Sequence, residues 1–269
     1  MTPSREVAAR VRAAARRRAR AAVLAVAGPR AQVSTGVHIL AGHGTGAPGP
    51  YAPEAFARML DLLASRVDLV RVEDAVELIR RRVDVDRPKV AFTFDDGYLD
   101  TYQHLAPALE AHDINAAFFI NSRYIGADPD YVEHFNRERI HAPGSRPMTA
   151  AMVAELADRG FVIGGHTCDH VMLDTADPVV LDDQIVTCKA EVEALSGKPC
   201  DWFAWPYGTY RDVSDAAIEL AGDTYDVVFS SDRYPSYTSH DGRVLNRRHF
   251  ETFWPESDVR FFLRKPRIH

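Results

Sequence analysis

Along most of the chain, short apolar runs of strand length alternate with segments of helical periodicity. The apolar runs are residues 37–40, 69–72, 90–94, 116–120, 161–165, 202–205 and 227–229. The helical patterns cover residues 53–65, 73–81, 101–112, 149–159, 177–197 and 212–221. Because parallel strands must be joined by long crossovers, repeated strand–helix units favour a parallel sheet, either open or closed into a barrel. The sequence therefore predicts an α/β fold.

Charge is distributed unevenly along the chain. Residues 1–30 contain eight arginines and one glutamate, a net charge of +7, whereas the whole chain of 269 residues has a net charge of -6. The remaining residues therefore carry a net charge of −13, which argues against a nucleic-acid-binding surface on the main domain. We predict a basic N-terminal segment over residues 1–30 and one catalytic domain over residues 31–269.

The N-terminal segment resembles a signal peptide only in part. Its apolar run, residues 21–27, is at the lower limit for a signal peptide and far too short to span a bilayer. We favour a solvated helix that makes a weak contact with an anionic membrane surface or a partner. The three cysteines, Cys168, Cys188 and Cys200, do not form a disulfide framework. These features favour a cytoplasmic location, with a secreted or membrane-associated protein as the alternative.

Two adjacent carboxylates, Asp95 and Asp96, follow directly after the strand at residues 90–94, and Gly97 comes next. Such a pair is costly unless a cation compensates the repulsion between like charges. A simple Asp-Asp-Gly turn is the alternative interpretation. Two other strand ends carry polar residues as well, namely "GGHTCDH" at residues 164–170 and "WPYG" at residues 205–208. Since chemistry collects at the C-terminal ends of parallel strands, these three segments are predicted to meet.

His166 and His170 are spaced by four residues, so both can bind one cation. Alone, such a pair is more often structural than metal-binding. Together with one carboxylate and a water, however, two histidines form a common catalytic site for Zn²⁺, and such a site also suits Fe²⁺ or Co²⁺. The second aspartate would then remain free as a base for the water.

The segments "TFDDG" (93–97), "HTCDH" (166–170) and "WPYG" (205–208) resemble the motifs of the polysaccharide deacetylase family, which is the NodB-homology or carbohydrate esterase family 4 group. The resemblance implies a distorted (β/α) barrel and metal-dependent removal of acetyl groups from sugars. It implies that Asp96, His166 and His170 bind the metal, most readily Zn with Co, Ni or Fe as alternatives. It further implies Asp95 as general base, the Tyr207 N–H as oxyanion donor and Thr167 as a residue that orients the histidine loop.

The sequence departs from the family pattern in three places. Ala204 stands where many members have an arginine that orients the base, and no late Leu-His motif supplies a general acid. In a permuted subgroup, which includes the poly-N-acetylglucosamine deacetylases, an N-terminal strand supplies that histidine after an aromatic residue. Here His43 follows Gly42. We predict His43 as general acid, with His249 and His240 as alternatives.

The same subgroup often uses an arginine near the last strand, and of the two available here, Arg247 and Arg248, we favour Arg248. Trp205 and Tyr210 are predicted to stack on the sugar together with Tyr207. The expected function is deacetylation of an amino sugar in a glycan or glycan precursor. The alternatives are de-N-acylation of a small glycosidic or nucleotide-linked intermediate, and a family member that binds metal without activity. Loops at residues 121–147 and 230–242 are expected to form the rim of the groove.

Overall fold

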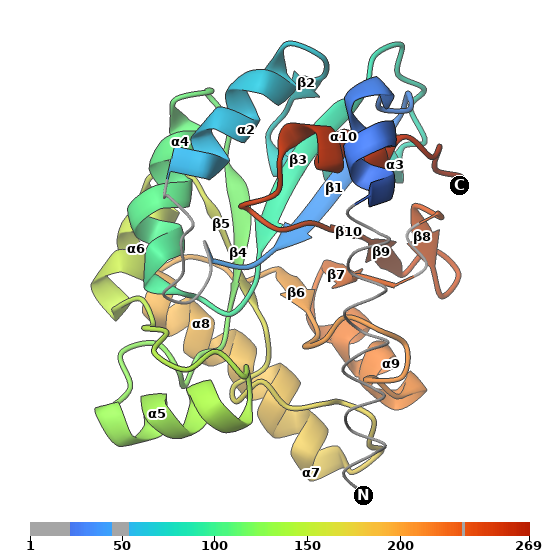
Figure 1. Cartoon of the computed structure of the whole chain (residues 1–269). Coiled ribbons are helices and arrows are strands. Elements are labelled where there is room, and N and C mark those ends of the chain that lie inside the picture. Colours follow the sequence, from blue (N-terminus) through green and yellow to red (C-terminus); the bar gives the residue numbers. More distant parts are fainter. Residues whose placement is uncertain (1–21, 45–53, 233–234) are drawn as a thin grey trace, which may run out of the picture.

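The computed structural model describes residues 22–44, 54–232 and 235–269 (Figure 1). Its centre is a 10-stranded sheet in which only β8 pairs antiparallel to its neighbour. The strands are β1 Val37–Gly42, β2 Asp68–Leu69, β3 Lys89–Phe94, β4 Ala116–Ile120, β5 Val162–Gly165, β6 Trp202–Ala204, β7 Val227–Ser230, β8 Thr238–Ser239, β9 Val244–Asn246 and β10 Arg248–His249.

The chain closes the sheet on itself near its C-terminal end. The strand order is β10-β1-β3-β4-β5-β6-β7-β9-β8, so β10 lies at one end of the order and β9 lies next to the other end. Only Arg247 separates these two strands in the chain, and β9 pairs with β7 while β10 pairs with β1. One continuous segment therefore joins the two ends of the sheet. The predicted distorted (β/α) barrel is confirmed.

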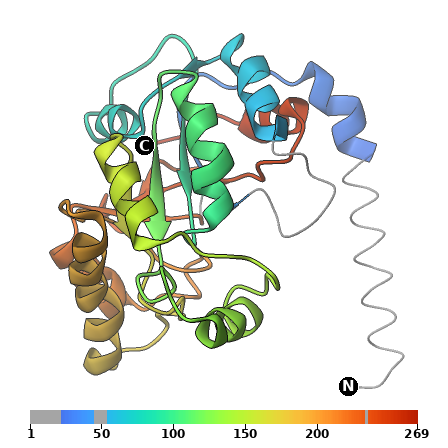
Figure 2. The same ribbon diagram turned by 90° about the vertical axis from the view of Figure 1, so that its left-hand side faces the viewer.

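Helices cover the outside of this barrel, and α5 lies apart from the layer that contains α4 and α6 (Figures 1 and 2). The longer helices are α2 Glu54–Ala64, α3 Val72–Arg80, α5 Pro129–Glu138, α6 Ala150–Asp158, α8 Cys188–Ser196, α9 Asp215–Thr224 and α10 Glu256–Leu263. The shorter turns are η1 Gly28–Arg30, the π-helical η2 Thr101–Leu105 and η3 Asp182–Thr187, α4 Ala106–Glu110 and α7 Pro178–Leu181.

Strand side chains divide between two buried clusters because successive residues point to opposite faces. Phe92, Phe118 and Phe203 pack with apolar residues of the surrounding helices. Ala91 and Phe119 belong to the second cluster, inside the barrel, together with apolar residues of α3. Asp95 follows Ala91 by four positions, so the alternation directs it toward the interior at the C-terminal end of β3.

Most predicted elements are present, with shifted bounds, but the long loop predicted over residues 121–147 contains a helix. The Asp128 carboxylate accepts hydrogen bonds from the Asp130 and Tyr131 N–H groups at 3.0 Å and thereby caps α5. The strand predicted at residues 69–72 ends at Leu69, because the Val72 N–H donates to Asn115 Oδ1 and α3 begins there. The short strands β8, β9 and β10 and the helix α10 were not predicted.

Residues 1–21 of the predicted basic segment lie outside the described residues. Residues 22–27 are helical, and the segment that follows them is attached to α10 and the chain after it. Ser34 Oγ donates to the carbonyls of Leu263 and Lys265 at 2.8 Å, and the Arg260 side chain donates to the carbonyl of Ala31. Among the described residues, no helix is both long and apolar enough to cross a membrane.

Candidate active site

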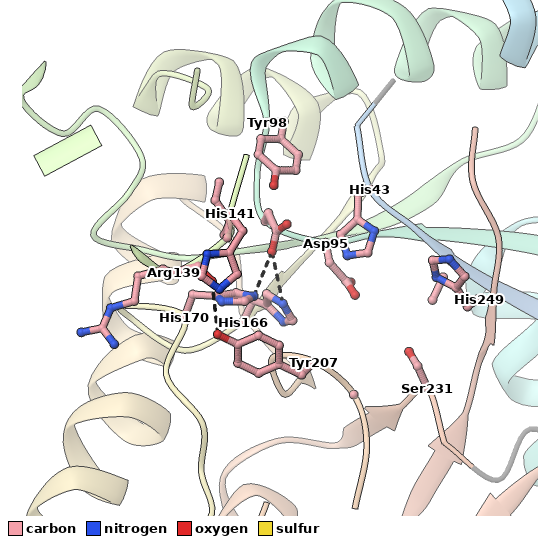
Figure 3. Close-up of a pocket in the computed structure, with 14 residues that line it drawn as sticks. His43, Asp95, Tyr98, Arg139, His141, His166, His170, Tyr207, Ser231 and His249 are labelled. Carbon is pink, nitrogen blue, oxygen red and sulfur yellow. Dashed lines mark hydrogen bonds and ion pairs between the residues drawn. The ribbon is translucent and has the colours of Figure 1, made fainter. Parts of the chain in front are cut away.

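A cluster of buried ionisable side chains lies at the C-terminal ends of the strands (Figure 3). Asp96 follows β3, and His166 and His170 follow β5. The Nε2 atoms of His166 and His170 lie 3.5 and 3.3 Å from Asp96 Oδ1, and each of the three residues is at most 6% exposed. The sequence therefore placed these three residues together correctly.

The backbone at this cluster adopts conformations that ordinary residues avoid. The φ angles of Asp96, Thr167, His170 and Tyr207 are 76°, 63°, 51° and 64°, all in the left-handed region. Such conformations cost about 1–3 kcal/mol each and persist only where the surrounding structure fixes them. Here they turn side chains of three separate loops toward one point.

Two hydrogen bonds fix the orientation of His166. Its Nδ1 lies 2.6 Å from the Ala204 carbonyl, and its backbone N–H donates to the Ile120 carbonyl at 2.9 Å. Because a carbonyl only accepts, Nδ1 carries a proton, so in the neutral imidazole Nε2 is the nitrogen with the lone pair. This tautomer is the one that a metal-ligating histidine needs.

Asn121, at the end of β4, holds the histidine loop. Its amide donates to the carbonyls of His166 and Thr167. Thr167 Oγ1, which the resemblance implied for this role, has no partner among the described residues. Asn121 was not predicted as a site residue, although a polar residue directly after the apolar run at 116–120 was a usable signal. Cys168 is buried, and its thiol contacts the Asp183 carbonyl at 3.1 Å.

Asp96 fits the role of a metal ligand. Burial opposes its ionisation, but the neighbouring imidazoles outweigh this effect and hold the pKa of Asp96 well below its usual value. Its Oδ1 atom is buried without a well-formed hydrogen bond among the described residues. The ligand atoms of Asp96, His166 and His170 all lie within 4.8 Å of one another. A carboxylate and two imidazoles at this spacing suit Zn²⁺, Fe²⁺ or Co²⁺.

The electrostatic potential at the cluster of Asp96, His166 and His170 also favours a bound cation. Burial disfavours a charged His166, yet the carboxylates of Asp95 and Asp96 outweigh burial and raise the pKa of this imidazole. The potential that favours a proton at His166 would favour a divalent ion in the same position, because both are positive charges.

Asp95 lies beside this triad and is held by Arg247. The guanidinium donates to Asp95 Oδ1 at 2.7 Å and to Oδ2 at 2.9 Å, and it also donates to Thr93 Oγ1 at 2.9 Å. Burial would raise the pKa of Asp95, but chiefly the charge of Arg247 outweighs it, and this pKa lies below its usual value. The carboxylate is therefore ionised and fixed in orientation.

The prediction that Arg248 serves the site is wrong. Arg248 donates to the carbonyls of Phe262 and Lys265, at 3.4 and 2.8 Å, and does not line the pocket. Adjacent residues of an extended chain point in opposite directions, so only one of the two arginines can face Asp95. Arg247 is that residue, and its guanidinium lies 5.1 and 5.8 Å from the ring centres of Phe119 and Phe229.

Tyr207 lies at the pocket, but the other two predicted sugar-stacking residues do not. Trp205 is 1% exposed, and its indole N–H donates to the Thr209 carbonyl at 3.1 Å. Tyr210 packs on Trp205 and donates to Asn246 Oδ1 at 3.1 Å, outside the pocket lining. Both predictions are corrected, because Trp205 is buried and Tyr210 packs on it away from the pocket.

Tyr207 itself is 43% exposed, and its ring lies 4.8 Å from that of His170. Its N–H finds no acceptor among the described residues and is available to a ligand.

Two of the three histidines considered as general acid line the pocket. His43, directly after β1, and His249, in β10, have ring centres 6.1 Å apart. His249 Nε2 is 3.0 Å from Glu251 Oε1, whereas His43 is close enough to Asp95 and Asp96 to lower the pKa of both. His240 packs on Tyr210 and does not line the pocket.

The pocket around the triad has a volume of about 460 Å³, which is within the range of small-ligand sites. Its lining includes residues that the sequence analysis did not single out, namely Tyr98, Arg139, His141 and Ser231. Burial and the Asp96 carboxylate raise the pKa of Tyr98, so its hydroxyl stays protonated.

Residues 82–225, just over half of the chain, match the family model described as Polysaccharide deacetylase. The chain belongs to the polysaccharide deacetylase family. Among curated members, YxkH of Bacillus subtilis (strain 168) is 26% identical over 133 residues, which is 49% of this chain and 42% of that protein. A protein of Geobacillus stearothermophilus is 22% identical over 116 residues, 43% of this chain and 36% of that protein. The chain thus spans about two fifths of the curated relatives that it matches.

Two solved structures share the fold over nearly their whole length. IcaB from Ammonifex degensii is 22% identical, with a TM-score of 0.65 over 87% of this chain and 99% of that chain. The Streptococcus pyogenes deacetylase PplD, solved in complex with acetate, is 17% identical, with a TM-score of 0.64 over 86% of this chain and 99% of that chain.

Proposed function

We propose that this protein is a metal-dependent carbohydrate deacetylase that hydrolyses the N-acetyl group of an amino sugar in a glycan or glycan precursor. The observation that carries the proposal is the pairing of two neighbouring carboxylates with different partners. Asp96 lies between two imidazoles, while Asp95 is held by a buried guanidinium in the same pocket. This arrangement suits a metal site with an adjacent general base.

Asp96, His166 and His170 would hold the ion, which supplies Lewis-acid activation of water and of the amide carbonyl. Asp95 accepts the proton of the attacking water, and Arg247 keeps its carboxylate ionised and oriented toward the pocket. The Tyr207 N–H donates to the oxygen of the tetrahedral intermediate, a contribution of about 3 kcal/mol for a well-placed donor. His43 donates a proton to the departing amine so that a neutral amino sugar leaves.

The proposal favours an active enzyme over a metal-binding protein without activity. The strongest support for an inactive protein was Ala204, because the family often has an orienting arginine there. Arg247, between β9 and β10, makes the bidentate contact with Asp95 instead. The base therefore has an orienting partner without an arginine at position 204.

Acetate release from N-acetylglucosamine, its oligomers and nucleotide-linked N-acetylglucosamine tests the proposal. The protein is stripped of metal, reloaded with Zn²⁺, Co²⁺, Ni²⁺ or Fe²⁺, and assayed beside His166→Ala. We expect metal-dependent acetate release by the native chain and none by the variant. Failure of every metal-loaded sample to release acetate from any of these substrates would contradict the proposed activity.

A further inference from the structure

We propose that Arg139 is a specificity-determining residue that binds an anionic group, a carboxylate or a phosphate, on the sugar next to the one that is deacetylated. This inference rests on the proposed function and narrows its substrate class to acidic glycans. It is carried by the position of Arg139 in the pocket and by the lack, among the described residues, of an acid paired with it.

Hydrogen bonds of the backbone fix the position of Arg139 at the pocket. It follows the last residue of α5, and its N–H donates to the Phe135 carbonyl at 2.9 Å. Its own carbonyl accepts from the Tyr207 hydroxyl at 3.2 Å, so its backbone is attached to the loop that carries the proposed oxyanion donor. The next residue, Ile140, packs against the buried cluster of Tyr98, Tyr124 and Phe135.

The Arg139 guanidinium has no hydrogen-bond or ion-pair partner within the described parts of the chain, although the side chain is only partly exposed and lines the pocket. The neighbouring arginine behaves differently. Arg137 is paired with Glu133 at 3.2 Å and with Glu138 at 2.8 Å. A half-buried guanidinium without an acid retains five donors for a planar anion such as a carboxylate or phosphate.

The surroundings of Arg139 reinforce the preference for an anion. His141 also lines the pocket, and its Nδ1 is bonded to the Arg137 carbonyl at 2.9 Å, which leaves Nε2 available. The acids in the described lining are Asp95 and Asp96, and both are already engaged, one by Arg247 and the other by the two imidazoles. No further carboxylate of this lining would repel an acidic ligand.

The direction of the Arg139 side chain indicates where the anionic group of the substrate would bind. Figure 3 shows Arg139 beside His141 and Tyr207, with its guanidinium turned away from the triad, whereas His43 and His249 lie on the other side of the triad in that view. A sugar whose acetamido group reaches the triad would therefore present its neighbour to Arg139. The anion is expected on that neighbour and not on the acetylated sugar.

The test compares three matched substrates of equal length. One is a neutral oligomer of N-acetylglucosamine, the second alternates N-acetylglucosamine with glucuronic acid, and the third carries 6-phosphate groups on alternate sugars. Each is assayed with the native holoenzyme, Arg139→Gln, Arg139→Lys and the control Arg137→Gln. We expect the native enzyme to prefer at least one of the two acidic substrates, and the preferred one identifies the anion as a uronate or a phosphate.

Arg139→Gln should lower kcat/KM for the preferred acidic substrate by about 10- to 100-fold, mainly through KM, and leave the neutral oligomer nearly unchanged. Arg139→Lys should restore part of the loss, and Arg137→Gln should have no effect. Equal rates of the native enzyme on all three substrates, or an equal loss by Arg139→Gln on all three, would overturn the inference.

Absence of acetate release from every substrate would count against the proposed function instead. Calorimetric titration of the acidic oligomers into native protein and Arg139→Gln would then decide the inference, since equal binding contradicts it.

Discussion

Asp95 and Asp96 are neighbours in the chain but have different partners in the fold. Asp95 receives a bidentate contact from Arg247, and Asp96 lies between two imidazoles. This difference supports the proposed roles, because the guanidinium neutralises and orients Asp95, whereas Asp96 directs an oxygen without such a partner at the two imidazoles. The proposed roles therefore depend on their partners and not on the acids themselves.

Asp95→Asn is expected to reduce turnover by roughly 10²- to 10⁴-fold, the usual contribution of a general base, while the protein still binds metal. His166→Ala is expected to lose both turnover and metal. Mass-spectrometric metal analysis after gel filtration, combined with the acetate assay, separates the two effects. A fully active Asp95→Asn enzyme would refute the assignment of the base.

Arg247→Met is expected to leave a buried carboxylate without its cation, which costs roughly 3–5 kcal/mol of folding free energy. The pKa of Asp95 in the folded protein would rise, since Arg247 is the main group that lowers it. Its ionised form would therefore be lost at a higher pH, and the acid limb of the kcat profile would move upward. Arg248→Met is the matched control, because its partners are backbone carbonyls. Identical acid limbs in both variants would contradict the role of Arg247.

At the scale of single elements, glycine is required where strands approach other groups closely. A Cβ atom at Gly164 in β5 would lie 2.5 Å from Phe119 Cδ1 and 2.8 Å from the Trp202 carbonyl oxygen. A Cβ atom at Gly222 in α9 would have no atom within 4 Å. The two glycines therefore differ in physical role.

Gly164→Ala is expected to destabilise the protein by about 1–3 kcal/mol through overpacking. Gly222→Ala is expected to stabilise it by roughly 0.5–1 kcal/mol, because alanine loses less backbone entropy in a helix. Urea denaturation of the two variants and the native protein measures both effects. Similar changes of the same sign would contradict this account.

β1 contains a fully buried histidine, His38, whose Nε2 lies 2.8 Å from the Ser34 carbonyl. Burial, with a further contribution from Arg248 and Arg267, lowers the pKa of His38 to about 3. Between pH 6.5 and 3 the unfolded chain binds a proton at this site and the folded chain does not. The stability that His38 contributes is therefore complete above its unfolded pKa and is lost as the pH falls toward its folded pKa.

The free energy of unfolding of the native protein should thus fall by up to about 1.4 kcal/mol per pH unit below pH 6.5 through His38 alone. His38→Gln keeps a donor for the Ser34 carbonyl but does not titrate. We expect the stability difference between the two proteins to change on acidification from pH 7 to pH 5, measured by chemical denaturation. If the free energies of unfolding of the two proteins changed equally with pH, His38 would not contribute to the pH dependence of stability.

At the scale of the whole molecule, the first and last segments of the described chain stabilise each other by direct contacts. The segment before β1 contacts α10 and the residues after it through Ser34 and Arg260, and Arg260 is buried beside Glu256. These contacts connect residues more than two hundred positions apart. They stabilise the same region in which β10 pairs with β1.

A chain that begins at residue 36 should therefore be less stable than one that begins at residue 22. It would leave the Arg260 guanidinium without its carbonyl acceptor on Ala31, and each such unsatisfied buried group costs about 1–3 kcal/mol. We expect its Tm to be lower by roughly 5–10 °C in a calorimetric scan. Equal melting temperatures of the two chains would mean that residues 22–35 do not stabilise the protein.

The sequence by itself determined the α/β class, the cluster of Asp96, His166 and His170 that could hold a metal, and the second carboxylate beside it. Alternating periodicities fix which elements form, and in a parallel sheet the polar residues that follow the strands gather at one edge. For this reason the Asp95–Asp96 pair and the two histidines His166 and His170 were expected to meet, and the family resemblance singled out Asp96 as the ligand.

Only the tertiary structure decided which arginine holds Asp95, that Trp205 is buried with Tyr210 packed on it, that Asn121 holds the histidine loop, and that Arg139 lines the pocket. Each of these depends on contacts between residues far apart in the chain. Arg247 and Arg248 are equivalent as sequence, but β9 pairs with β7 and β10 with β1, and this change of partner directs Arg247 inward. Local sequence fixes local conformation, whereas the direction of a side chain into a shared pocket is fixed by the closure of the barrel.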